Sequence, residues 1–304
     1  MIGAKRPQEN RLRVLFCIQP AAEGRIRLAQ SGRTGYNRKN ARAGTDGAGG
    51  KTDAKGNGAV GMKEEKGSNR YYLICERNWI YFILILVAGF WGSFTYLLRG
   101  NVFCNAQTGN VVLMGMALGT GKWLEGLYYL IPISAYMMGA FVSELFPNPI
   151  KHRLSVRWDT LLILIEMAVI AFLGFVPDSA PVQISQVAIN FIASMQYNTF
   201  RQAEGIAVST TFATNHIRQI GIGLAKELRH HRAHDTSHRP KLWMHLRMLL
   251  FFVIGAVTGA ALSAHFGGRA IWATLLPLAF VFAVLLYADL VVEKEKIEQK
   301  PSGH

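Results

Sequence analysis

Charged side chains are scarce in this chain of 304 residues: 17% are Asp, Glu, Lys or Arg, and 50% are hydrophobic. A soluble globular protein carries about 25% charged residues. The positive charge is concentrated, because residues 1–61 hold 12 Lys or Arg against 4 Asp or Glu, which is +8 of a net +14. This composition excludes a soluble enzyme with one modest core, a disordered chain and a nucleic-acid-binding domain, so we expect no nucleic-acid partner.

Cysteine is rare as well, with only Cys17, Cys75 and Cys104. The odd count and the lack of CxxC spacing predict neither a disulfide framework nor a zinc site.

Two weaker motifs are rejected. Gly119–Lys122 lacks the first glycine and the preceding strand of a phosphate loop, and the histidines of 230–238 fit a solvated basic loop better than a metal site. We therefore expect no metal, no cofactor and no enzymatic activity.

Long apolar stretches are abundant, and six of them are suitable for crossing a membrane, which takes about 20 residues. They are Trp79–Leu98, Leu127–Phe146, Thr160–Val176, Val182–Phe200, Leu246–His265 and Ile271–Val292. The predicted fold class is an all-α polytopic membrane protein, with the lipid bilayer as its surroundings.

Two further segments, Asn101–Gly119 and Ile206–Leu224, begin with polar residues and continue into short apolar runs. Each either crosses the membrane or enters and leaves on one side as a re-entrant half-helix, buried in protein or lining a wet cavity. If both cross, the loop with Lys151 and Arg157 lies outside, against the positive-inside rule. If both are re-entrant, that loop, the basic stretch 226–247 and both termini lie in the cytoplasm. We favour six spans plus two re-entrant segments.

A weak internal repeat agrees with this topology. Shifting the chain by 106 residues aligns Thr108 with Thr214, and a shift of 116 aligns Gly139 with Gly255. Each repeat then has three full crossings, so the second copy is inverted, as in many transporters. Gly139-x-x-x-Ser143 and Gly255-x-x-x-Gly259 predict close helix packing.

The expected organisation has four parts. Residues 1–61 are a disordered basic tail or upstream sequence from a mis-assigned start, and 62–78 are a cytoplasmic lead-in. The membrane domain covers 79–292, with repeat 1 at 79–176 and repeat 2 at 182–292. Residues 293–304 form a cytoplasmic tail.

Three short motifs resemble one known family. Phe103–Asn110 is similar to the F-x-x-x-Q-T-G-N signature of the YoaK family, and Ser209–Asn215 resembles its T-T-(aromatic)-x-T-G segment, with Asn215 in place of the usual glycine. Met195–Asn198 resembles its M-Q-N stretch. The likeness covers about 79–292. It implies a bacterial inner-membrane protein with about six spans and no known activity.

The two polar segments supply most of the candidate substrate-binding residues. Thr108, Gly109 and Asn110 stand where the first half-helix begins, where Thr or Asn can cap the helix and free N–H groups can meet an anionic group. The alternative is that these residues only cap and pack. The candidate binding residues are Asn105, Thr108, Gly109, Asn110, Asn190, Thr211, Thr214 and Asn215.

The span Val182–Phe200 carries a polar stripe at helical spacing, formed by Gln183, Gln186, Asn190, Ser194 and Asn198, with Arg201 beyond it. Polar stripes avoid lipid, so this face is expected to look inward. It lines a substrate path or holds helices together through hydrogen bonds.

Glu166 lies near the middle of a predicted span and is the candidate proton or ion site. An ionisable group there costs about 2.5–3.5 kcal/mol or more, so it is a functional candidate by default. The alternative is a protonated carboxyl hydrogen-bonded to a neighbouring helix.

These features favour a secondary transporter or permease for a small molecule or ion that the sequence does not identify. The alternatives are a non-catalytic membrane scaffold or regulator and, less favoured, an intramembrane enzyme acting on a lipid or quinone. Such an enzyme needs a catalytic cluster at membrane depth, where the sequence offers only Glu166 and His216. Homo-oligomerisation is left open.

Overall fold

The computed structural model describes residues 71–145, 156–230, 236–296, 299 and 301. The chain divides into two units, 1–64 and 65–304, and every described residue belongs to the second. The expected tail at 1–61 therefore lies outside the described residues.

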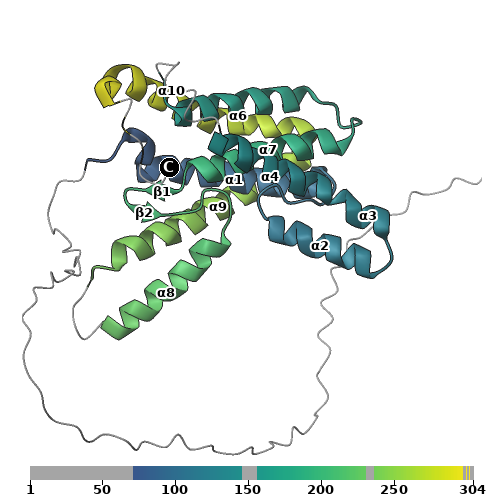
Figure 1. Ribbon diagram of the computed structural model, residues 1–304, viewed down its shortest axis with the longest axis horizontal. Coiled ribbons are helices and arrows are strands. Elements are labelled where there is room, and N and C mark those ends of the chain that lie inside the picture. Colours follow the sequence, from purple (N-terminus) through teal and green to yellow (C-terminus); the bar gives the residue numbers. More distant parts are fainter. Residues whose placement is uncertain (1–70, 146–155, 231–235, 297–298, 300, 302–304) are drawn as a thin grey trace, which may run out of the picture. The chain divides into compact units, whose positions relative to one another are not determined.

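The described residues are mainly helical, and two short strands form an antiparallel hairpin (Figure 1). In chain order the elements are η1 (Ile74–Glu76), α1 (Asn78–Leu98), α2 (Gln107–Gly119), α3 (Trp123–Tyr128), α4 (Leu130–Leu145), α6 (Trp158–Phe175), α7 (Val182–Thr199), β1 (Gln202–Ala203), β2 (Ile206–Ala207), α8 (Thr214–His230), α9 (Arg239–Phe266), η3 (Gly267–Thr274), α10 (Leu275–Tyr287), η4 (Ala288–Val292) and η5 (Lys294–Lys296). Apart from the β1–β2 hairpin, this matches the predicted helical class.

Four helical stretches of the described residues are long and apolar enough to cross a membrane: Asn78–Leu98, Trp123–Leu145, Trp158–Phe175 and Arg239–Val292. The last contains 54 residues, which is enough for two crossings, and η3 separates its two long helices. The α7 helix has 18 residues but is more polar than these four stretches. The structure thus shows a multi-pass membrane architecture.

Helix α1 packs along α9, and α4 packs along α7. Glycines allow both close approaches: a Cβ atom at Gly255 would collide with the Leu86 carbonyl of α1, and one at Gly139 would collide with the Phe191 carbonyl of α7. Because no side chain separates the backbones at these glycines, the helices approach closely and are stabilised by van der Waals contacts. The predicted small-residue contacts are present in both pairs.

The basic stretch expected as a loop at 226–247 is largely helical, which corrects that prediction. Helix α8 continues to His230, and α9 begins at Arg239, seven residues before the expected Leu246. The two helices pack side by side, with Leu242 against Gly223, and Glu227 of α8 pairs with Arg239 of α9. Hydrogen bonds from Arg239 and then His238 lower the pKa of Glu227 to about 2. Cross-helix packing therefore stabilises basic segments whose composition alone indicated a loop.

Ion pairs stand at both ends of α6. At its start, buried Arg157 pairs with buried Asp289 and Glu293, which follow α10. Beyond its end, Asp178 pairs with Arg99, the buried residue that follows α1. These contacts fix α6 between the carboxyl ends of α10 and α1.

Candidate functional site

The first polar segment is irregular up to residue 106, and α2 begins at Gln107. The N-cap residue is Ala106, and no side chain caps this helix, so the predicted capping role of Thr108 or Asn110 is wrong. Asn110 folds back instead: its Oδ1 accepts from the Phe103 N–H at 3.0 Å and its Nδ2 donates to the Phe103 carbonyl at 2.7 Å. The amide of Asn110 closes the loop because it satisfies both backbone groups of one residue.

Gln107 links this loop to the polar stripe of α7. Its Nε2 donates to Oδ1 of Asn190 at 2.7 Å, and its Oε1 accepts from Nδ2 of Asn110 at 3.0 Å. Asn190 and Asn110 are both completely buried. The structure thus joins two predicted site residues through Gln107, a residue that the sequence reasoning left out of the site although it belongs to the motif.

The polar stripe of α7 faces inward, as predicted, since Gln186, Asn190 and Ser194 are completely buried. Gln186 donates to the Arg99 carbonyl and accepts from the Tyr128 hydroxyl at 2.6 Å. These bonds connect α7 to the segments after α1 and α2. The bonds of Gln186 are the interhelical hydrogen bonds expected if the stripe holds helices together. Ser194 makes no such bond, since its hydroxyl has no hydrogen-bond partner among the described residues.

The other candidates of the first segment have different environments. Asn105 is buried and donates to the Ala88 carbonyl of α1 at 3.1 Å. Gly109 is half-buried against the ring of Phe103, whereas Thr108 is exposed. Asn105 therefore contributes to packing on α1, and Thr108 stands apart from the network of Asn110.

The second polar segment borders a cavity of about 480 Å³. Its lining residues are Tyr197, Asn198, Arg201, Ala207, Val208, Ser209, Phe212 and Asn215. Of the predicted site residues, Asn215 belongs to this lining, Thr211 is completely buried and Thr214 is exposed. Tyr136 of α4 lies beside Thr211.

Glu166 lies on the buried face of α6 with Leu162, Ile163 and Ile170, and its exposed fraction is 0%. Neither carboxyl oxygen has a hydrogen-bond partner among the described residues. A charged carboxylate in such surroundings is very costly, so this group is stable when it carries a proton or when a cation reaches it.

A buried histidine pair joins α8 to α9. His216 and His245 are both 0% exposed, and their Nδ1 atoms lie 2.9 Å apart. His216 Nε2 donates to the Ser209 carbonyl at 2.8 Å, because a carbonyl oxygen can only accept. With both rings neutral, His216 Nδ1 must then accept a hydrogen bond from His245 Nδ1. His245 Nε2 is left as a bare lone pair, with no partner among the described residues.

The sequence reasoning noted His216 but missed its partner. His245 shares the buried face of α9 with Leu242, Met244 and Met248, and a histidine on such a face is the signal that could have identified it. The partnership itself depends on the packing of α8 against α9, which local sequence does not reveal.

Several long apolar helices joined by buried polar contacts define a multi-pass membrane protein. The family model for "Protein of unknown function (DUF1275)" matches residues 80–284, so the chain belongs to this family. It is 24% identical over 223 residues to the UPF0700 transmembrane protein YoaK of Bacillus subtilis (strain 168), covering 72% of this chain and 97% of that protein. The resemblance to the YoaK family is thereby confirmed. No solved structure gives a significant match.

Proposed function

We propose that this protein is a secondary transporter or permease for a small solute, and that it carries out no enzymatic reaction. The observation that carries the proposal is Glu166, a completely buried carboxyl group without a hydrogen-bond partner among the described residues, midway along a helix suited to crossing the membrane. Such a group can take up and release a proton or cation as a solute moves. A purely structural role would favour a partnered side chain.

The helix pairing supports an inverted repeat, which is common in transporters. In the proposed repeats, α1 and α7 are equivalent first helices, and α4 and α9 are equivalent later ones. Each first helix packs on the later helix of the other repeat, as α1 does on α9 and α7 on α4. The glycine contacts also correspond to within one residue: Gly139 meets Phe191 and Gly255 meets Leu86, which the shift of 106 aligns with Ile192.

The lengths of α2 and α8 support two re-entrant segments. With 13 and 17 residues, they rise about 20 and 25 Å, and neither belongs to the described helical stretches that are long and apolar enough to cross a membrane. We propose six crossings, both termini in the cytoplasm and a bacterial inner-membrane location. The proposed solute path runs along α7, between the network of Asn110 and Asn190 and the cavity that Asn215 lines.

A solute screen in proteoliposomes tests the proposal. Purified protein is reconstituted with the pH dye pyranine trapped inside, and pools of amino acids, sugars, organic acids, nucleosides and inorganic ions are added under a pH gradient. Protein-free liposomes are the control. Solute-dependent proton movement or uptake supports transport, and flat traces with every class, together with no uptake of labelled solutes, contradict it and favour a scaffold.

A further inference from the structure

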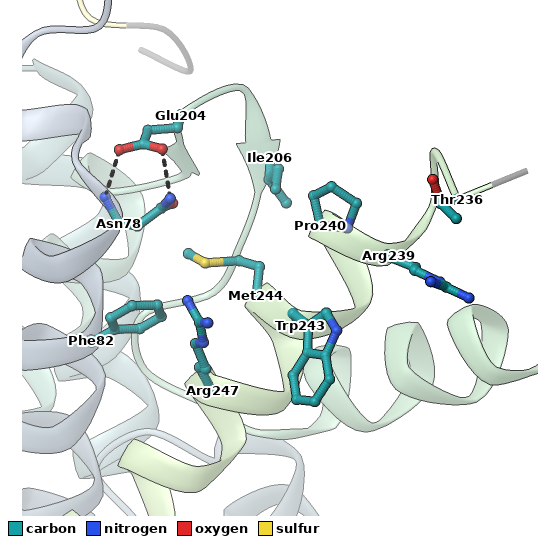
Figure 2. Close-up of a pocket in the computed structure, with 10 residues that line it drawn as sticks. All are labelled: Asn78, Phe82, Glu204, Ile206, Thr236, Arg239, Pro240, Trp243, Met244 and Arg247. Carbon is teal, nitrogen blue, oxygen red and sulfur yellow. Dashed lines mark hydrogen bonds between the residues drawn. The ribbon is translucent and has the colours of Figure 1, made fainter. Parts of the chain in front are cut away.

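A second cavity, of about 630 Å³, lies beside the first turns of α1 and α9 and next to the β1–β2 hairpin (Figure 2). The lining combines polar and apolar side chains: Asn78, Phe82, Glu204, Ile206, Thr236, Arg239, Pro240, Trp243, Met244 and Arg247. Both helices begin here and continue as long apolar stretches. In the proposed topology, the cavity therefore lies where these helices enter the membrane.

Three charged side chains line this cavity, and two of them have partners. Glu204 accepts a hydrogen bond from Asn78 Nδ2 at 2.6 Å (Figure 2), and Arg239 is paired with Glu227. Arg247 is exposed and makes neither a hydrogen bond nor an ion pair among the described residues. The cavity thus presents one free guanidinium group.

At the position of Arg247 on α9, an unpaired positive charge is energetically unfavourable. Arg247 lies eight residues after Arg239, about 12 Å further along α9, and the apolar run that begins at Met248 follows it. A cation at this depth is stabilised when its side chain reaches the headgroup level and meets an anion. Trp243, one turn earlier and 57% exposed, is the type of residue enriched at the membrane interface.

We propose that this cavity binds the headgroup of an anionic phospholipid, with Arg247 holding the phosphate. Guanidinium and phosphate groups form paired, charge-assisted hydrogen bonds, which suits a single free arginine better than a lysine. Phe82, Met244 and Ile206 supply an apolar wall for the glycerol and first methylene groups. Inorganic phosphate shares the charged chemistry but gains nothing from this wall.

The test is a thermal-unfolding titration of the purified full-length protein in detergent micelles. The added probes are phosphatidylglycerol, phosphatidylcholine and inorganic phosphate. The compared variants are Arg247→Gln and Arg229→Gln, a matched change at an exposed position of α8 outside the cavity. We expect phosphatidylglycerol alone to raise the melting temperature. Arg247→Gln should weaken its apparent affinity about tenfold or more, while Arg229→Gln leaves it unchanged.

Three outcomes overturn the proposal. Equal stabilisation by inorganic phosphate shows a phosphate-ion site in place of a lipid site, and equal stabilisation by phosphatidylcholine shows a general lipid effect. An Arg247→Gln response identical to the unmodified protein removes Arg247 from the site. If Arg247→Gln does not fold, Arg247→Lys replaces it, because lysine keeps the positive charge but cannot form the paired bonds of a guanidinium group. A weaker affinity of this variant for phosphatidylglycerol supports paired guanidinium–phosphate bonding, and an unchanged affinity contradicts it.

Discussion

His216 Nδ1 lies 2.9 Å from His245 Nδ1, so a completely buried ring of α8 hydrogen-bonds a completely buried ring of α9. Replacing either residue with leucine should lower the free energy of unfolding by about 1–3 kcal/mol, since the remaining ring keeps a buried nitrogen without its partner. The double replacement should cost less than the sum of the two. Unfolding in detergent micelles measures this double-mutant cycle.

His265→Leu is the matched control, because His265 is an exposed residue of the same helix. This replacement should change the free energy of unfolding by no more than about 0.5 kcal/mol. Strictly additive effects of the two buried replacements would contradict a direct interaction between His216 and His245.

Gly255→Ala should destabilise the protein by about 1–3 kcal/mol, since the added Cβ collides with the Leu86 carbonyl and pushes α1 away from α9. Gly115→Ala is the control. A Cβ atom there meets nothing within 4 Å, so alanine should be neutral or stabilise α2 by up to about 1 kcal/mol. Thermal melts of both variants test the difference, and equal melting temperatures would refute the close helix contact.

Arg157→Met should be strongly destabilising, by about 3–5 kcal/mol, because Asp289 and Glu293 remain buried without their cation. Adding Asp289→Asn and Glu293→Gln to this variant should restore much of the lost stability. Arg201→Met is the comparison: its pair with Glu144 is exposed, so about 1 kcal/mol or less is expected. A similar loss of stability in Arg157→Met and Arg201→Met would contradict this prediction, because it would show that burial does not strengthen the effect of losing the cation.

The topology makes a prediction of its own. In a background with Cys17, Cys75 and Cys104 replaced by serine, a cysteine at Lys151 should resist membrane-impermeant maleimide applied outside intact cells, whereas one at Ser179 should react. Ser179 is chosen because it leaves the Arg99–Asp178 pair intact. Labelling of position 151 from outside would overturn the re-entrant segments.

Much of the helical architecture was predictable because apolar runs of membrane length are a strong signal. Thus the inward face of α7 followed from the spacing of Gln186, Asn190 and Ser194, which are completely buried as expected. Local sequence did not reveal where α8 ends and α9 begins, because both segments are basic and polar. Their helical structure is stabilised by contacts between the two helices, namely the Glu227–Arg239 ion pair and the packing of Leu242 on Gly223.

The candidate site was predictable only in part. Asn110 and Asn190 share one network, but the motif predicted a helix cap where Asn110 instead closes a loop on Phe103. A side-chain amide can bond either way, and the loop geometry decides which bond forms. The contact of His216 with His245 spans 29 residues, so it follows from tertiary packing and leaves no local pattern.

The most direct test of the account is proton-coupled flux in Glu166→Gln, measured in pyranine-loaded proteoliposomes with a solute that the screen shows to be moved. Glutamine keeps the size of the side chain and removes its titration, so the variant should express and fold normally but lose the dependence of flux on the pH gradient. Glu125→Gln, at a largely exposed side chain on α3, should behave as the unmodified protein. Unchanged pH-dependent flux in a well-folded Glu166→Gln variant would contradict the proton-carrier role and leave Glu166 a packing residue.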